Sequence, residues 1–289
     1  MKRRHLFPCL LPMLLWWTVS GCEKHPLDKE ISLEDAAKML IDESTIGKSI
    51  YGGNLVATDT VDADGLARPT ALHGWVAHWD SPVHTYDITY DTVVDRGVPD
   101  LRGAIMSIRD SMKVTLDLII DADSVIRKTN HTTCRTGALL VQLGAYGDAY
   151  NGWVLRKIAH RRFRGPGATP SITSVTVQSG DSSWALSEAQ FSIDLVPKLS
   201  REKSITVRVK TRDATDRAFL NVGDSGTRRR IPMTYHAQSN EFVGGWTVSS
   251  AAASKYYQAF VEVYSNTTFT SLTPSDIGVA GQTFVYRIP

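Results

Sequence analysis

Alternation of apolar and polar residues constrains this chain more than any other feature. From Val83 to the C-terminal residues, apolar side chains recur at every second position in one run after another, which is typical of β-strands with one buried face. The clearest run places Met112, Val114 and Leu116 on one face and Lys113 between them. A chain with this pattern builds sheets, so we expect successive antiparallel strands from Val83 onward.

One amphipathic helix precedes the strands. Ser32 is a typical N-cap residue for it, and acidic Asp35 stands three residues later. The apolar face that follows consists of Leu33, Ala36, Ala37, Leu40 and Ile41. Residues 47–74 contain several glycines and no sustained period, which predicts a loop or a broken helix.

Residues 31–163 therefore predict an α+β domain in which a helix packs on one face of a curved antiparallel sheet. Two features of this segment, the Asp121 to Ser124 turn between two long strands and the closing strand Gly152 to Ile158, resemble the nuclear-transport-factor-2-like superfamily. That superfamily includes ketosteroid isomerases and many catalytically silent bacterial modules. The resemblance implies a cone-shaped domain whose mouth would be lined by residues of the strand beginning at Val83.

Residues 164–171 predict a linker, because glycine and proline recur there and favour solvated, extended backbone. Residues 172–289 then predict an all-β sandwich. Its aromatic-Gly-Trp strand, Phe242 to Trp246, resembles the immunoglobulin-like modules of bacterial surface proteins. We expect strands at Ile172 to Val177, Phe191 to Val196, Ile205 to Lys210, Ala218 to Val222, Arg230 to Thr234, Phe242 to Val248, Tyr257 to Tyr264 and Phe284 to Ile288.

The first 22 residues predict an export signal. Three basic residues precede an apolar run from Leu6 to Trp17 that is too short to cross a bilayer permanently. The run closes on Val-Ser-Gly before Cys22, which resembles the lipobox of bacterial lipoproteins and implies a lipidated cysteine. Membrane contact through lipid on Cys22, a tether over residues 23–30, and a place at the outer membrane of the cell envelope follow from the resemblance.

Charge and cysteine content narrow the function classes. The chain has 32 Lys and Arg against 30 Asp and Glu, and removing the three cations of the leader leaves 29 against 30. A protein without basic surplus is a poor candidate for nucleic-acid binding. Cys9 lies in the leader and Cys22 in the lipobox, so Cys134 has no partner for an intramolecular disulfide.

Two short motifs look catalytic or metal-binding but lack the residues that the chemistry needs. Gly223 to Gly226 matches the tetrapeptide around the nucleophile of trypsin-like proteases, yet the context of the catalytic histidine is missing. Thr60 to Gly65 resembles part of a calcium loop, but Thr60 replaces the first aspartate and Ala71 the last glutamate. We interpret both as turns.

The segment from His73 to Tyr90 is the best candidate for ligand contact, because histidines and aromatic residues can hydrogen-bond and stack on a ligand. Histidine and carboxylate are zinc ligands, but the spacing does not match a zinc motif. We therefore expect neither a metal nor a cofactor, and place these residues on a rim. The predicted ligand-binding residues are His73, Trp75, His78, Trp79, His84, Tyr86 and Tyr90.

The predicted function is that of a non-catalytic envelope lipoprotein that binds a partner protein, a glycan or a small apolar ligand. The alternative is an isomerase or hydrolase with its pocket in the α+β domain, for which Tyr86 or Tyr90 with Asp117 would be the starting point. Two basic clusters, His160 to Arg164 and Arg228 to Arg230, are interpreted as solvated strand ends; the alternative is that either contacts anionic headgroups or glycans.

Overall fold

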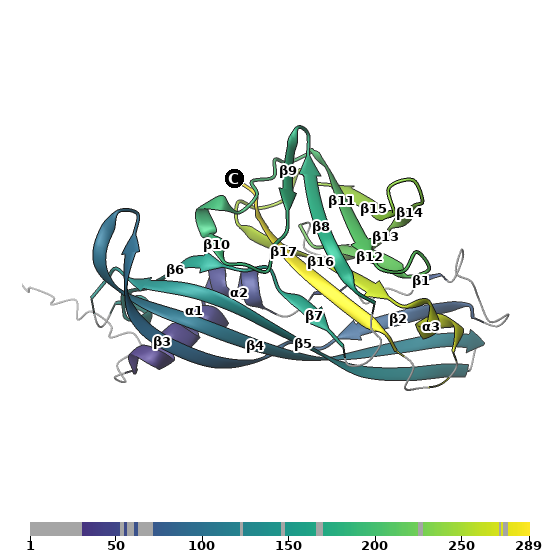
Figure 1. Cartoon of the computed structure of the whole chain (residues 1–289), viewed down its shortest axis with the longest axis horizontal. Helices are drawn as coiled ribbons and strands as arrows, with labels where there is room; N and C mark the ends of the chain where they lie inside the picture. The colour runs from purple at the N-terminus through teal and green to yellow at the C-terminus, as the bar shows by residue number, and fades with distance from the viewer. Residues whose placement is uncertain are drawn as a thin grey trace, which may run out of the picture. The chain divides into compact units, whose positions relative to one another are not determined.

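The computed structural model describes residues 31–52, 55–56, 61–62, 72–121, 124–145, 148–165, 170–224, 228–271, 273 and 277–289. The leader, the tether, most of the calcium-like turn and Ser225 of the protease-like tetrapeptide lie outside these ranges. Residues 33–289 form one compact unit, which is described below. The unit is mostly β with few helices, and its main sheet is curled and antiparallel (Figure 1).

The first helix, α1 (Leu33–Asp42), is the one expected from the sequence. Its predicted apolar face is buried at Ala36, Ala37, Leu40 and Ile41. None of the helices in the described part of the chain has the length and apolar character needed to cross a membrane.

A second helix, α2 (Thr45–Tyr51), occupies the start of the stretch predicted to be a loop or broken helix. Ser44 caps it by accepting a hydrogen bond from the backbone N–H of Gly47 at 2.9 Å. A Cβ atom at Gly47 would lie 2.3 Å from the carbonyl oxygens of Leu40 and Ile41. The tight α1–α2 corner therefore requires glycine, which a search for apolar periodicity does not detect.

Long antiparallel strands follow the helices. β3 and β4 are joined by a hairpin at Arg96 and Gly97, whose positive φ angles of 49° and 82° are typical of two-residue hairpin turns. β4 also pairs with β2 and β5, so the three longest strands lie side by side along the lower part of Figure 1. The elements of this part are β1 (Val61–Asp62), β2 (Gly74–Trp79), β3 (Val83–Asp95), β4 (Val98–Asp121), β5 (Ser124–Gln142), the 3₁₀ turn η1 (Ala149–Gly152), β6 (Trp153–Ile158) and β7 (Arg162–Arg164).

The regular elements of the remaining chain are almost all strands, as expected. The sequence did not predict β9, and the predicted run Phe191 to Val196 forms only a short strand and a 3₁₀ turn. The elements are β8 (Ile172–Ser179), β9 (Ser182–Ala185), β10 (Phe191–Ser192), η2 (Ile193–Leu195), β11 (Ser204–Thr211), β12 (Arg217–Val222), β13 (Arg229–Pro232), β14 (Thr234–His236), β15 (Glu241–Thr247), β16 (Tyr256–Tyr264), α3 (Asn266–Thr270) and β17 (Val279–Arg287).

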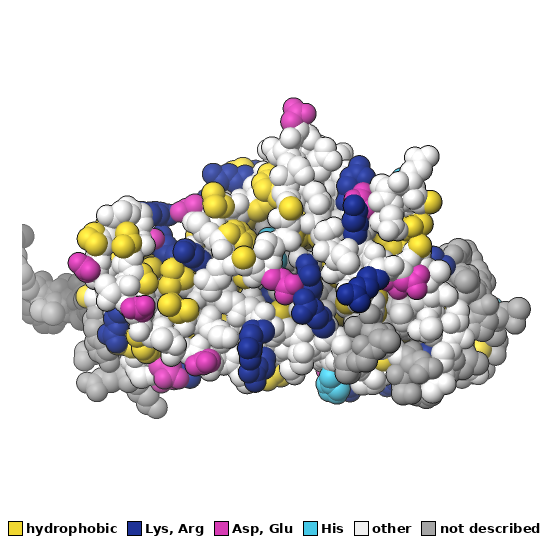
Figure 2. Space-filling model, in the orientation of Figure 1, with side chains coloured by type: hydrophobic (Ala, Val, Ile, Leu, Met, Phe, Trp, Pro, Cys, Tyr) yellow, Lys and Arg dark blue, Asp and Glu magenta, His cyan; other side chains and the backbone are white. Residues whose placement is uncertain are grey.

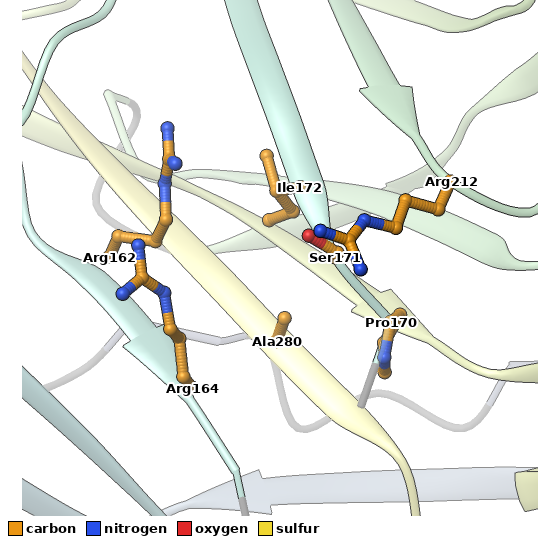
Figure 3. A pocket seen from close by; sticks show the side chains of 7 residues that line it. All are labelled: Arg162, Arg164, Pro170, Ser171, Ile172, Arg212 and Ala280. Atoms are coloured by element: carbon orange, nitrogen blue, oxygen red, sulfur yellow. The ribbon is translucent and has the colours of Figure 1, made fainter. Parts of the chain in front are cut away.

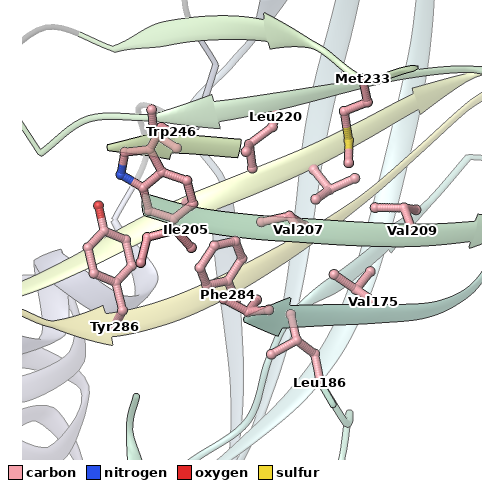
Figure 4. Close-up of a cluster of buried hydrophobic side chains, with 14 of the residues drawn as sticks. Val175, Leu186, Ile205, Val207, Val209, Leu220, Met233, Trp246, Phe284 and Tyr286 are labelled. Atoms are coloured by element: carbon pink, nitrogen blue, oxygen red, sulfur yellow. The ribbon is translucent and has the colours of Figure 1, made fainter. Parts of the chain in front are cut away.

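The described strands form two sheets. Five strands in the order β14-β15-β11-β8-β9 make the smaller sheet, and the other twelve make the larger one. The single predicted run from Arg230 to Thr234 breaks at Met233, and β13 and β14 on its two sides belong to different sheets. The side chains between the smaller sheet and strands β12, β16 and β17 form an apolar core (Figure 4): Val175, Leu186, Ile205, Val207, Val209, Leu220, Met233, Trp246, Phe284 and Tyr286 are among them.

A second apolar core joins residues from before and after the predicted linker. Trp75 of β2 lies edge-on to Phe219 at 4.9 Å between ring centroids, and Trp79 lies edge-on to Phe260 at 4.8 Å. The larger sheet is also continuous across the linker, because β7 pairs with both β5 and β17. Division at residues 164–171 into independently folding parts stays a prediction, and the shared core and sheet oppose it.

We expect Trp79→Ala to lower the free energy of unfolding by about 3–5 kcal/mol, the usual cost of removing a large buried aromatic side chain. The variant also loses the hydrogen bond that Trp79 Nε1 donates to Tyr264 Oη at 3.2 Å. Chemical denaturation measures the change. His78→Ala is the matched control, because His78 precedes Trp79 on the same strand and is exposed. Equal losses for the two variants would contradict the placement of Trp79 in the core.

Candidate functional site

The predicted ligand-binding residues of β2 are divided between its two faces. Trp75 and Trp79 are buried in the second core, with exposed fractions of 0% and 7%. His78 on β2 and His73 just before it are exposed. The tryptophans thus lie below the surface and away from a rim, because the C-terminal part of the chain covers the face of β2 that carries them.

His84 and Tyr86 belong to a row of polar groups between α1, β3 and β4. His84 Nδ1 is 2.7 Å from the carboxylate of Asp110, which is fully buried. The other ring nitrogen of His84 lies 3.9 Å from Asp42 at the end of α1, and Tyr86 donates a hydrogen bond to that same aspartate. The row thus joins the helix to the sheet through alternating acidic and basic or phenolic groups.

Arg161 closes the row from inside. Its Nη1 lies 3.1 Å from Asp110 Oδ2 and donates to the backbone oxygen of Tyr51 at 2.9 Å, and its side chain is 1% exposed. Burial alone would raise the pKa of Asp110, but the hydrogen bond with His84 and the charge of Arg161 outweigh it and lower the pKa. Asp110 is thus held as a carboxylate that neutralises a buried guanidinium.

The groups proposed for isomerase chemistry are not brought together. Tyr86 faces Ile108 of β4 in the strand register, nine residues before Asp117 on that strand, a separation of about 30 Å at the usual rise of a strand. Asp117 instead makes a bidentate pair with Arg127, at 2.8 Å for both bonds. Tyr90 lies farther still from Asp117 and stacks on the ring of Trp153, with centroids 6.1 Å apart.

The histidines of the segment are likewise dispersed. Among the described residues, no three His, Cys, Asp or Glu side chains gather in an arrangement that would hold a metal ion. Cys134 is a free, buried thiol on β5, and burial raises its pKa to about 12.

A pocket of about 300 Å³ lies elsewhere, between β7, the start of β8 and the loop after β11 (Figure 3). Arg162 and Arg164 line one side and Arg212 extends toward them from the other, beside Ser171. The rest of the lining is small or apolar: Pro170, Ile172 and Ala280. We refer to this site as the arginine pocket.

Strand pairing positions the two arginines of β7. Arg164 lies opposite Ala280 and Arg162 opposite Gln282 in the antiparallel pair of β7 with β17. Residues two apart in a strand point to the same face, so both guanidinium groups reach one side of the sheet. Arg162 Nε is also fixed by donating to Gln282 Oε1 at 3.1 Å.

Positive charge exceeds negative charge at the arginine pocket. One glutamate, Glu188, accepts a hydrogen bond from Arg164 at 3.0 Å and forms an ion pair with Arg162 at 3.0 Å. Arg212 makes no hydrogen bond or ion pair with the described residues and is exposed. Figure 2 shows Lys and Arg side chains gathered beside β7, with an acidic side chain among them. The site therefore carries three guanidinium groups against one carboxylate.

The sequence indicated the two β7 arginines of this pocket but not Arg212. The predicted basic cluster at His160 to Arg164 is divided, because Arg161 turns inward to Asp110 while Arg162 and Arg164 line the pocket. In the second cluster, Arg230 is buried against Glu262 at 2.6 Å. Arg212 follows a different strand, and no local pattern connects it to β7.

A more apolar hollow of about 250 Å³ lies on the other side of the loop that carries Glu188. Its lining includes Trp184, Phe191 and Leu195. His160 also lines it, with its ring 4.8 Å from that of Phe191, and burial lowers the pKa of this histidine to about 4. The hollow thus offers a neutral surface.

Comparison with known proteins adds no assignment. A scan of protein-family models, a search of curated proteins and a search of solved structures each found no match to this chain.

We expect Asp110→Ala to lower the free energy of unfolding by about 3–5 kcal/mol, because it leaves the guanidinium of Arg161 buried without its carboxylate. Asp117→Ala is the matched control on the same strand. Its partner Arg127 is 69% exposed, so that loss should stay within about 1 kcal/mol. Urea denaturation at neutral pH measures both.

The same pair predicts a pH dependence. Because the folded pKa of Asp110 is lowered, its contribution is complete above the ordinary carboxyl pKa of about 3.9 and is lost as the pH falls through the folded value. The difference in the free energy of unfolding between the native chain and Asp110→Ala should therefore become smaller below about pH 4. A difference that widens on acidification would contradict the role given to this carboxylate.

Proposed function

We propose that this chain is a non-catalytic, lipid-anchored envelope protein that binds a small anion carrying more than one charge. The excess of guanidinium groups over carboxylates in the arginine pocket supports this proposal. Guanidinium groups donate several hydrogen bonds in a fixed plane, which suits carboxylate, phosphate and sulfate oxygens. A volume of about 300 Å³ is at the lower end for ligand sites and suits a small molecule.

The arginine pocket differs from the buried ion pairs of the unit. Arg161 and Arg230 are each 1% exposed, and each has a carboxylate within 3.1 Å. Their charges are therefore neutralised inside the fold and are not available to a ligand. Arg164 is 62% exposed and Arg212 is exposed as well. Solvent-facing cations without full compensation are available to a ligand.

We place the ligand here in preference to the apolar hollow, although the sequence suggested an apolar ligand as one alternative. An uncompensated positive charge favours one class of ligand, the anions, whereas an apolar lining of that size accepts many classes of ligand. The enzymatic alternative is weaker, since Asp117 is engaged by Arg127 and lies far along β4 from both tyrosines.

We further propose that the protein is anchored at the outer membrane through Cys22, on the strength of its lipobox. Within the unit, we propose that residues 31–163 are a nuclear-transport-factor-2-like module and residues 172–289 an immunoglobulin-like one. Helix α1 and α2 beside a curved sheet support the first, and the two-layered core of Figure 4 supports the second.

We expect Arg212→Gln to weaken the binding of inorganic pyrophosphate to the full-length protein, purified in a non-ionic detergent, by at least fivefold. The substitution leaves a shorter, neutral polar side chain and removes the charge of Arg212, which has no carboxylate partner among the described residues. Isothermal titration calorimetry at low salt measures the dissociation constant.

The matched control is Arg102→Gln, which removes an exposed guanidinium on β4 that lies over the ring of Tyr90 and outside the pocket lining. It should leave pyrophosphate binding unchanged. No measurable binding to the native protein, or equal weakening by the two substitutions, would reject the arginine pocket as the ligand site.

We expect Cys22→Ala to remove the protein from the membrane fraction, because the lipid would then have no attachment point. Fractionation with immunoblotting should find soluble protein or uncleaved precursor. Cys134→Ala is the control and should stay in the membrane fraction. Normally processed Cys22→Ala in the membrane pellet would contradict the lipobox interpretation.

A further inference from the structure

Glu188 occupies the arginine pair in the way that a bound anion would. A single oxygen, Oε1, lies 3.0 Å from Arg162 Nη1 and 3.0 Å from Arg164 Nη2. The glutamate comes from the loop between β9 and β10, a segment distant in sequence from β7. Its side chain is 39% exposed, so solvent reaches the carboxylate that pairs with the two guanidinium groups.

We infer that Glu188 is a tethered competitor for the arginine pocket, and that the ligand is a small molecule with two adjacent anionic groups. One group would replace the Glu188 carboxylate on Arg162 and Arg164, while the second would reach Arg212. This inference rests on the proposed function and adds to it the class of ligand and an autoinhibitory contact.

The requirement for two anionic groups follows from competition. A carboxylate on the chain is present at a high effective concentration and loses little entropy when it pairs. A ligand with one anionic group that displaced Glu188 would only replace the two ion pairs that the glutamate already makes, with no gain to offset its own immobilisation. A ligand with two groups gains the contact to Arg212, which Glu188 does not make.

The Glu188 side chain can leave without disturbing the loop. The backbone N–H of Leu186 is held by Val175 O at 2.9 Å, and the N–H of Ala189 by the hydroxyl of Ser187 at 3.0 Å. Gln190 packs against Gly137, where an added Cβ would lie 2.3 Å from its amide nitrogen. The loop is thus fixed on both sides of Glu188, and displacement requires only rotation of one half-exposed side chain.

The experiment compares Glu188→Gln with the native full-length protein, with inorganic pyrophosphate, malonate and acetate as probes. Glu188 is partly exposed, and at the usual contribution of surface ion pairs its two pairs provide together about 0.4–2 kcal/mol. Glu188→Gln should therefore bind pyrophosphate and malonate about twofold to thirtyfold more tightly. The native protein should bind both in preference to acetate. Calorimetry at low salt measures all dissociation constants.

Glu241→Gln is the matched control. Glu241 also lies between two cations, Arg208 and Lys210, at 3.5 Å from each, but it is on the smaller sheet and does not line the pocket. It should leave the affinities unchanged. Glu188→Asp separates contact from charge: withdrawal of the carboxylate by one methylene group should give part of the gain, whereas a long-range effect of charge would give none.

The outcomes distinguish the two proposals. Binding of pyrophosphate that depends on Arg212 but is equal in the native protein and Glu188→Gln overturns the competitor role and leaves the anion site standing. Acetate binding as tight as that of malonate overturns the requirement for two anionic groups. Absence of pyrophosphate binding in both proteins overturns the anion site, and the inference with it.

Discussion

Strand β17 is the element on which the rest of the described fold depends. It pairs with β16 along its whole length and with β7 on its other edge, and every residue except Arg287 is buried. A strand enclosed on both faces and both edges must pair all of its backbone groups inside the protein. The two sheets and both apolar cores are therefore fixed relative to this one strand.

Small and polar residues of β17 also position the segments that pack against it. A Cβ at Gly281 would lie 2.1 Å from the ring of Phe260, so glycine allows the aromatic core to approach the backbone. Gln282 receives the Nε hydrogen of Arg162, and Thr283 Oγ1 receives the backbone N–H of Arg161 at 3.0 Å. Successive residues of the 161–164 segment are thereby directed to opposite sides, Arg161 into the core and Arg162 into the pocket.

The strands could be predicted from sequence because one buried face gives a period of two. The position of the tryptophans could not, because the sequence around β2 does not reveal that a distant segment covers that face. Trp75 and Trp79 contact Phe219 and Phe260, which follow more than a hundred residues later. Local pattern identifies an apolar face correctly, but the chain that covers it is chosen by tertiary pairing.

The arginine pocket was missed for the same reason. Arg162 and Arg164 stood out as a basic cluster, yet the cluster alone does not distinguish a buried ion pair from an exposed site. The carboxylates make that distinction. Asp110 on β4 neutralises Arg161, whereas Glu188 in the loop after β9 pairs with Arg162 and Arg164. Arg212 can be recognised as the uncompensated positive charge of the arginine pocket only when the positions of all these segments are known.

Three carboxylates among the described residues, Asp110, Glu188 and Glu241, each pair with two basic groups. Their surroundings show why we infer a ligand at only one of them. Asp110 is fully buried between His84 and Arg161, so removing it would strand a charge in the core. Glu241 joins Arg208 and Lys210 across one sheet face at 3.5 Å, where solvent can replace it. Glu188 pairs with two arginines of a pocket whose lining includes a further cation, Arg212. A carboxylate in that position offsets part of the positive charge when no ligand is bound, and it is displaced by a ligand that binds all three arginines.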